Sequence, residues 1–411
     1  MSARIEIVRA AALSAAPLML VIALWPLLLP FPDVGDTFLF WAAGHMVVTG
    51  QSPYDHASWE AAAAYGPYPG GVAANTATIN LGITAVWAYP PQTAFLFAPF
   101  GALPYEVGVP LLHVFILLGG LAAIVASALV AGLRGPQLAF ALSLALISQP
   151  FVIGVRYGHP IGLLVLGVVL VYVGILRRRN GPALLGAALL TLKPHLTGPF
   201  ALGAVAYVVW QRDWRRLGAM AAGAVLVTLP FEIVTPFPIA AIVASGGGRL
   251  AGDLSTLPAL ARDLGGGLRL AVALALLTGA ACVVAFVRAP TDLRPRVALA
   301  SALVGSLAAI PYAHDYDWLL VMPAACVLLA LGIGRRAAAP VALLTVFALV
   351  IVPWLLFFWW SLAGEPKRVL LSGPLGAVPL VLALALAAAA TAARVGEARG
   401  GARGPGRRGI A

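Results

Sequence analysis

Apolar residues along this chain gather in long, nearly unbroken runs instead of alternating with polar residues. A helix needs about 20 consecutive apolar residues to cross a bilayer whose hydrocarbon core is about 30 Å thick. Only helices and closed barrels satisfy every backbone polar group in lipid, and runs this long and continuous exclude barrel strands. The pattern therefore predicts an all-α, polytopic membrane protein.

The apolar runs predict about 12 transmembrane helices, with both chain ends on the cytoplasmic side. The pair 182–193 and 196–211 is short and breaks at Pro194, and broken helices at membrane depth are tolerated where they line a cavity. The segment 89–103 is too short for a full span, so we expect a re-entrant or interfacial helix there, although a true crossing would shift the early topology. The predicted spans are 10–30, 107–133, 136–155, 160–176, 182–193, 196–211, 217–236, 268–288, 297–311, 317–334, 338–360 and 373–393.

The long loop after the first predicted span, 31–87, contains carboxylates and aromatic residues but no lysine or arginine. Within this loop the stretch 36–50 predicts an amphipathic helix that lies at the membrane surface. We expect a single transmembrane domain over 1–393 in which the first outer loop carries interfacial helices. A Gly/Arg-rich, disordered, basic cytoplasmic tail is expected over 394–411.

Composition and charge placement agree with this topology. The chain is 61% hydrophobic and 10% charged, whereas about 25% charged residues is usual in soluble domains. Its net charge of +11 would suggest nucleic acid on a soluble protein, but basic clusters mark cytoplasmic helix ends here, so membrane lipids and no nucleic acid are the expected partners. The clusters are Arg177–Arg179, Arg212 with Arg215 and Arg216, Arg288 with Arg294 and Arg296, Arg335 with Arg336, and the tail from Arg394 to Arg408.

Most carboxylates and histidines then fall on the outer side, which was not assumed in placing the helices. Cys282 and Cys326 both lie inside apolar runs, so each is expected to pack as a small hydrophobe without a disulfide. No Cys/His spacing typical of a metal site occurs, and neither a metal nor a cofactor is expected. The candidate chemistry therefore lies on the non-cytoplasmic face.

Two of the outer clusters contain residue types that take up a proton or bind a phosphate. Ionisable groups near membrane depth are costly and usually functional. Asp36, after the first span, is a candidate general base, and the alternative is the N-cap of an interfacial helix. Arg156, with Tyr157 and His159, is a candidate phosphate-binding group, and the alternative is an ordinary interfacial belt.

Two further clusters lie later in the chain. Lys193, Pro194 and His195 stand at the predicted helix break, and Lys193 is one of only two lysines in the sequence. We expect Lys193 to bind an anionic ligand, the alternative being a lysine that extends to the interface. The turn from His314 to Asp317 holds an imidazole and two carboxylates that can exchange protons or position a hydroxyl, the alternative being a solvated turn.

The order of several short motifs resembles glycosyltransferase family 87, a family of the GT-C class. Asp36–His45 (DTFLFWAAGH) and Gly50–Asp55 (GQSPYD) resemble its first outer loop, and Tyr89–Pro104 resembles the following Pro-Pro segment. Leu192–Pro194 is similar to a Lys-Pro element, and His314–Asp317 to a late outer loop. Two positions depart from the family pattern, because Phe40 replaces a common Tyr and His159 a common Gln.

The resemblance implies a GT-C-like fold and an inverting transfer of a sugar, taken as mannose, from a polyprenyl-phosphate donor to a lipid or glycan hydroxyl. The enzyme would lie in the cell inner (plasma) membrane with its active site on the periplasmic or extracellular side. The residues implied are Asp36 as catalytic base, His314 as a catalytic residue that positions the acceptor or assists the base, Lys193, His195, Arg156 and His159 on the donor phosphate, and Tyr54, Asp315, Tyr316 and Asp317 on the substrates.

Two alternatives stay open at this point. A transporter or flippase for an anionic or lipid-linked substrate predicts ionisable residues in mid-span, where His113 is the clearest candidate. A ligase that moves a whole glycan from a lipid carrier would need the same outer cations and base, so the sequence separates it poorly from a sugar transferase.

Overall fold

The regular structure of the protein is helical throughout the part of the chain that can be described. The computed structural model describes residues 35–62, 87, 89–238, 256–310, 313–333, 335–363 and 375–401. Within these ranges every element is an α-helix or a 3₁₀-helix, which confirms the predicted all-α class. The elements are α2 (Gly35–Val48), α3 (His56–Ala62), α5 (Pro91–Gly101), α6 (Tyr105–Ala131), α7 (Pro136–Leu146), α8 (Gln149–Tyr157), α9 (Ile161–Leu176), α10 (Asn180–Leu190), α11 (Pro194–Trp210), α12 (Trp214–Val234), α14 (Leu257–Asp263), α15 (Gly267–Arg288), α16 (Arg294–Leu307), η3 (Asp315–Val321), α17 (Met322–Gly332), α18 (Ala339–Ala363) and α20 (Val378–Gly401).

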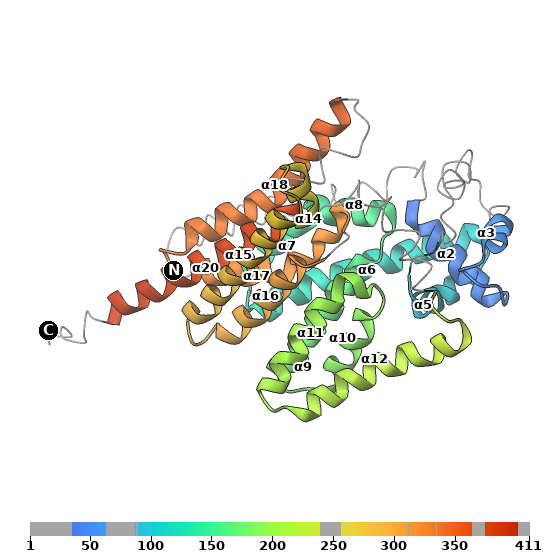
Figure 1. Ribbon diagram of the computed structural model, residues 1–411, viewed down its shortest axis with the longest axis horizontal. Helices are drawn as coiled ribbons and strands as arrows, with labels where there is room; N and C mark the ends of the chain where they lie inside the picture. Colours follow the sequence, from blue (N-terminus) through green and yellow to red (C-terminus); the bar gives the residue numbers. More distant parts are fainter. Residues whose placement is uncertain are drawn as a thin grey trace.

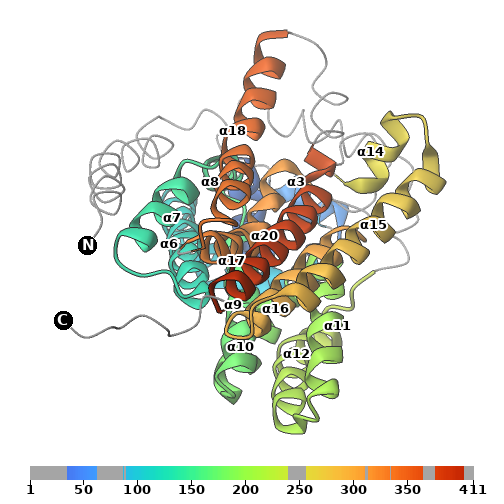
Figure 2. The same ribbon diagram turned by 90° about the vertical axis from the view of Figure 1, so that its left-hand side faces the viewer.

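The arrangement divides into groups of helices around α6. Figure 1 shows α2, α3 and α5 at one end of α6, and α9 to α12 as a separate group below it. The later helices α15 to α20 lie together on the other side, and Figure 2 shows α15, α16, α17 and α20 running beside one another. Direct packing of α6 on α9 connects α6 to the second group, and packing of α17 on α6 and of α16 on α11 connects the later helices to both.

Six helical segments among the described residues are long and apolar enough to cross a membrane. They are α6, α12, α15, η3 with α17, α18 and α20, and the bent pair α7 and α8 raises the number to seven if it forms one span. The protein is therefore a polytopic membrane protein. The predicted spans 160–176, 182–193, 196–211 and 297–311 correspond to shorter helices, and 10–30 lies outside the described residues, so the total of 12 stays a prediction.

Two helix breaks follow from proline positions. Pro194 is the first residue of α11, and Lys193 before it is non-helical, as the residue before a proline tends to be. The predicted break at Pro194 is thereby confirmed. Pro150 lies in the first turn of α8, which meets α7 at 55° after an extended Ser148. Each break places a polar side chain against the start of η3, where Lys193 bonds to Asp317 and Gln149 bonds to Asp315.

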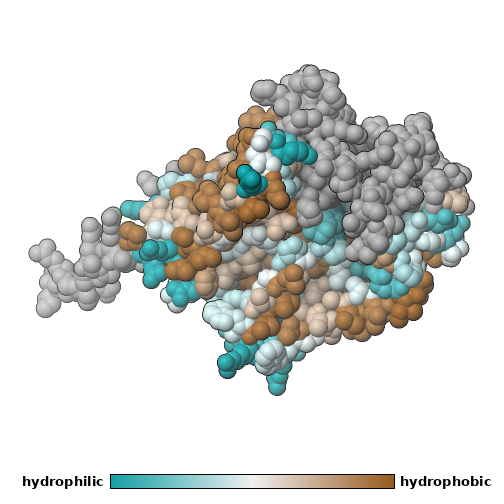
Figure 3. Space-filling model, in the orientation of Figure 1, coloured by the Kyte–Doolittle hydropathy of each residue, from teal (hydrophilic) through white to brown (hydrophobic). Residues whose placement is uncertain are grey.

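The outer surface of several long helices is apolar. On α12, Leu226 is 65% and Ile233 73% exposed. Only 11% of the most apolar 18-residue stretch of this helix is buried. Hydrophobic residues form a continuous area in the lower part of Figure 3, where α12 lies in Figure 1. Apolar surface of this extent is costly in water but is solvated by lipid chains in a bilayer. This surface is what a membrane-spanning helix requires.

Three expectations about shorter segments have different outcomes. The helix predicted at 36–50 exists as α2, but its amphipathic character is wrong, because most of its side chains from Thr37 to Met46 are buried against α5 and α6. The segment 89–103 forms the 11-residue helix α5, too short for a full span. The helix α20 continues to Gly401, so the first part of the predicted disordered tail is helical, and 402–411 lie outside the described residues.

Two glycines on α12 give a matched test of the helix packing. A Cβ at Gly223 would lie 2.1 Å from the backbone carbonyl oxygen of Leu184 on α10, whereas a Cβ at Gly218 meets nothing within 4 Å. We expect Gly223→Ala to destabilise the protein by about 1–3 kcal/mol, because backbone atoms must move apart. We expect Gly218→Ala to be neutral or slightly stabilising. Thermal unfolding of both variants in detergent checks this, and equal melting temperatures would contradict the close contact of α10 and α12.

Candidate active site

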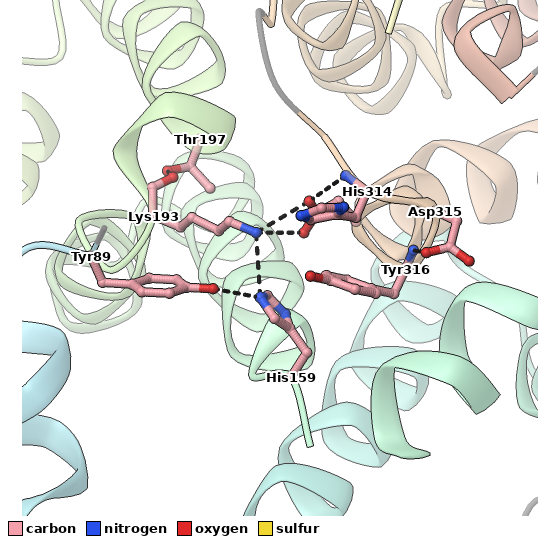
Figure 4. A network of polar contacts seen from close by, with 8 residues as sticks. Tyr89, His159, Lys193, Thr197, His314, Asp315 and Tyr316 are labelled. Atoms are coloured by element: carbon pink, nitrogen blue, oxygen red, sulfur yellow. Dashed lines mark hydrogen bonds and ion pairs between the residues drawn. The ribbon is translucent and has the colours of Figure 1, made fainter. Parts of the chain in front are cut away.

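A buried ion pair joins two helix ends that are far apart in the chain. Lys193 (Figure 4) precedes α11. Its Nζ lies 2.9 Å from Oδ1 and 3.1 Å from Oδ2 of Asp317 in η3. The side chains of Lys193 and Asp317 are 4% and 1% exposed. Because each charge alone would be strongly destabilising in such surroundings, the two groups stabilise each other.

His159 and Tyr89 complete the surroundings of the ammonium group. Nζ of Lys193 lies 3.3 Å from Nε2 of His159, and the hydroxyl of Tyr89 lies 3.0 Å from the same nitrogen. Nζ is also 5.8 Å from the ring centre of Tyr89 and 5.7 Å from that of Tyr316, within range of cation–π attraction. Figure 4 shows Tyr89 and Lys193 reaching the same side of the His159 ring.

The turn at the start of η3 is held by its own carboxylates. The amide of His314 donates to Oδ2 of Asp317 at 2.9 Å, so Asp317 both pairs with Lys193 and closes the turn. Asp315 accepts hydrogen bonds from the Tyr316 amide at 2.9 Å and from the Gln149 side chain at 2.5 Å. The ring centres of Tyr316 and His159 are 4.4 Å apart, which places the turn directly against the Lys193 cluster.

Helix α5 anchors the break at which Lys193 lies. A break leaves the last carbonyls of α10 without helical partners. The side chain of Gln92 donates to the carbonyl of Thr191 at 2.9 Å, and the hydroxyl of Thr93 donates to that of Leu192, also at 2.9 Å. Thr197 on α11 donates to the carbonyl of Lys193 at 3.1 Å. These bonds fix the backbone on both sides of the ammonium group.

The structure brings together many, but not all, of the residues that the sequence singled out. Lys193, His159, Tyr316 and Asp317 contact one another, and His314 joins them through its amide bond to Asp317 and its ring contact with Tyr316. Asp315 is bonded instead to Gln149 on α8.

The remaining predicted residues lie at the edge of the cluster or outside the description. Arg156 is exposed at the end of α8 and has no hydrogen bond or ion pair in the described part of the chain. The hydroxyl of Tyr54 donates to the carbonyl of Tyr89 at 2.7 Å. Asp36 lies in the first turn of α2, and its side chain is outside the description; the ring of Phe40, four residues later, is 5.8 Å from that of His159.

Sequence reasoning missed two contributors. Tyr89 and Gln149 were not assigned a role, although each bonds directly to a predicted site residue. The only signal for Tyr89 was its place at the start of the Pro-Pro segment, and Gln149 lay within an apolar run that predicted a continuous span.

Burial keeps two histidines of the cluster, His159 and His195, neutral. Burial lowers the pKa of His159 well below its usual value, and the nearby Lys193 ammonium lowers it further. Burial also lowers the pKa of His195 to about 3, again assisted by the charge of Lys193. Neutral imidazoles can accept and donate hydrogen bonds at once, which a charged ring cannot. Among the described residues, no three His, Cys, Asp or Glu side chains are placed to hold a metal ion.

Together these features define a polytopic membrane protein with a buried, charge-paired polar cluster at the ends of its helices. The family model of glycosyltransferase family 87 matches residues 87–310, more than half of the chain, including Tyr89, His159 and Lys193. The chain therefore belongs to glycosyltransferase family 87 and is a membrane glycosyltransferase. No curated protein and no solved structure matches it in the corresponding searches.

The neutral histidines predict how stability depends on pH. Because the pKa values of His159 and His195 are lowered in the folded state, the unfolded chain binds more protons below about pH 6.5. Their contribution is therefore fully present above pH 6.5 and is lost as the pH falls, at up to about 1.4 kcal/mol per pH unit for each histidine.

Thermal unfolding in detergent between pH 7.5 and 5.5 measures this dependence. The melting temperature should fall with pH, and His159→Gln should make the dependence less steep. A melting temperature that rises as the pH falls over this range would contradict neutral, buried imidazoles.

Proposed function

We propose that this glycosyltransferase moves a mannose unit from a polyprenyl-phosphate donor to a hydroxyl of a lipid or glycan acceptor, with inversion at the anomeric carbon. The observation that carries the proposal is the polar cluster around Lys193, which lies at helix ends and against an apolar cavity. Family membership supplies the reaction class, and the cluster supplies the groups that such a transfer needs.

The position of the cluster supports an active site on the outer, periplasmic or extracellular, face of the inner (plasma) membrane. His159 precedes α9 and Lys193 precedes α11, while Arg177 follows α9 and Arg212 follows α11. The site and the basic clusters are thus at opposite ends of the same helices. Basic residues mark the cytoplasmic side of membrane proteins, so the opposite end faces outward.

The transfer needs a base, an attacking oxygen and a leaving phosphate. The acceptor hydroxyl oxygen attacks the anomeric carbon and forms the new glycosidic bond, while the bond from that carbon to the phosphate oxygen breaks. The hydroxyl proton passes to the carboxylate of Asp36, and the leaving polyprenyl phosphate keeps the electron pair. Attack from the face opposite the phosphate inverts the anomeric configuration. Stabilising the charge that develops on the leaving phosphate is the large catalytic term.

We assign the binding roles according to charge and exposure. The phosphate diester of the donor carries one negative charge, and the exposed guanidinium of Arg156 can bind it by two parallel hydrogen bonds. His159 and His195 act as neutral partners beside it. Lys193 contributes its positive charge next to Asp317, and direct contact of Nζ with the phosphate requires Asp317 to release an oxygen.

The acceptor side of the site is assigned to the turn before η3 and to the loop after α2. His314 positions the acceptor hydroxyl, and Tyr316 and Asp315 border the sugar. The hydroxyl of Tyr54 donates to the backbone carbonyl of Tyr89, so Tyr54 lies at the edge of the cluster where Tyr89 is. Asp317 acts on the substrates through Lys193 and the turn that it closes.

An apolar cavity next to η3 suits the prenyl chain. It lies between α7, α8, η3, α17 and α18 and has a volume of about 40 Å³, which gives room for a short segment of hydrocarbon. Its lining is almost entirely apolar and includes Trp318, the residue after Asp317. A polar cluster at the start of η3 and an apolar cavity beside its later residues match an amphiphilic donor, with phosphate at the first and hydrocarbon at the second.

The placement of the charges favours an enzyme over a transporter. A transporter places substrate groups near the bilayer centre on discontinuous helices. Here His159 and Lys193 lie at the starts of α9 and α11, at the ends of these helices opposite to Arg177 and Arg212, and not in mid-span. His113, the clearest mid-span candidate, lies 3.5 Å from the hydroxyl of Thr37 on α2, which is a local contact between packed helices.

A transfer assay in membranes with a radiolabelled polyprenyl-phosphate sugar tests the proposal. Asp36→Asn should reduce transfer by about 100-fold or more, because the general base is lost. Arg156→Ala should raise the KM for the donor more than it changes kcat. Asp55→Asn, an exposed carboxylate of the same outer loop, is the matched control and should retain transfer. Full transfer by Asp36→Asn would remove this residue from catalysis, and no transfer by the native chain from any such donor would contradict the proposed function.

A further inference from the structure

The hydrogen bonds at Lys193 account for every N–H of its ammonium group. An ammonium has three N–H donors and no acceptor. Two point to the oxygens of Asp317, at 2.9 and 3.1 Å, and the third to Nε2 of His159 at 3.3 Å. Lys193 is only 3% exposed, so these three partners complete its surroundings.

These three hydrogen bonds determine which ring nitrogen of His159 carries the proton. Since Lys193 can only donate, Nε2 of His159 must accept, and it therefore carries no hydrogen. The hydroxyl of Tyr89, 3.0 Å from the same nitrogen, is the second group on this side of the ring. Burial and the Lys193 charge both lower the pKa of His159, so the ring is neutral and holds one proton. That proton must be on Nδ1.

The Nδ1–H group that results has no partner. His159 is 1% exposed, and its Nδ1 atom has no hydrogen bond within the part of the chain that the structure describes. Leaving a buried donor unsatisfied costs about 1–3 kcal/mol. Such a cost at a candidate active site is expected where a ligand atom supplies the missing acceptor.

We propose that Lys193 and Tyr89 hold His159 in the Nδ1–H form, and that this N–H donates to an oxygen of the donor's phosphate as it leaves. The inference rests on the proposed function and assigns Lys193 and Tyr89 as positioning residues that act through His159. No bond other than the hydrogen bond is formed or broken at His159, and its proton stays on Nδ1.

Two features favour the phosphate over a sugar hydroxyl as the acceptor. The phosphate gains a full negative charge during the transfer, so a fixed donor stabilises the transition state more than the ground state, whereas a hydroxyl gains none there. The rings of Tyr316 and Phe40 are centred 4.4 and 5.8 Å from that of His159, and they keep water away from its Nδ1–H group. A hydrogen bond is stronger in such surroundings than in water.

Nitrogen NMR of the protein labelled with ¹⁵N-histidine measures the tautomer without reference to activity. The chain has six histidines, and comparison with His159→Gln identifies the signals of His159. We expect a protonated Nδ1 and an unprotonated Nε2 in the native protein. The Nε2–H form should increase in the double variant Lys193→Met/Asp317→Leu, which removes the obligatory donor without leaving a buried charge. A protonated Nε2 in the native protein overturns the proposal.

Farnesyl phosphate and farnesol serve as probes of the acceptor. Farnesyl phosphate should shift the Nδ1 signal of His159, and farnesol, which has the same chain without the phosphate, should leave it in place. Equal shifts with both probes, or no shift with either, would overturn the assignment of Nδ1–H to a phosphate oxygen. Inorganic phosphate should shift the signal only at much higher concentration, since it lacks the apolar chain; an effect at equal concentration would overturn the link to the lipid donor.

Two substitutions separate the nitrogens of His159 in the transfer assay. The amide nitrogen of Asn lies near the place of Nδ1, and that of Gln near the place of Nε2. We expect His159→Gln to lower kcat by about 100-fold, as loss of one donor to a developing oxyanion does. We expect His159→Asn to stay within about 10-fold of the native enzyme. The reverse order, measured on folded protein while the native chain still transfers sugar, overturns this inference and leaves the proposed function standing.

Discussion

The buried pair of Lys193 and Asp317 is the interaction on which the organisation of the site depends. Removing an ion from water costs several kcal/mol, and attraction offsets this only where the geometry is good and the other hydrogen bonds are made. Here both oxygens of Asp317 contact Nζ, and one of them also accepts the His314 amide. The pair therefore holds the break between α10 and α11 against the turn of η3 and brings His159 and Tyr316 into contact.

The ion pair of Lys193 and Asp317 also decides which cation of the site is left without a neutralising partner. Asp317 neutralises Lys193, and burial keeps His159 and His195 uncharged. Arg156 at the end of α8 remains as an exposed cation beside the cluster. In this account the donor phosphate meets one guanidinium and a set of fixed neutral donors. Such an arrangement can bind a singly charged diester without holding the doubly charged product too tightly.

Much of this architecture follows from features that a single sequence contains. Apolar runs predict the long helices, and Pro194 predicts the break, because a proline cannot continue a helix. The clustering of His159, Lys193 and the turn from His314 follows from placing each at an outer helix end. The sequence could not show that Lys193 faces Asp317, since that contact depends on how η3 packs against α8, α9 and α17. The prediction that α2 is amphipathic was wrong for a similar reason, because packing against α5 and α6 buries most of its side chains. Tyr89 was missed because its partner, His159, comes 70 residues later.

A double-mutant cycle on Lys193 and Asp317 tests the central claim most directly. Stability in detergent is measured for Lys193→Met, for Asp317→Leu and for the two together. If the two buried charges stabilise each other, each single substitution should lower the stability by about 3–5 kcal/mol, because it leaves one charge unpaired. The double variant should recover most of that loss. Independent, additive effects of the two substitutions would show that the groups do not interact, and would contradict the account of the site.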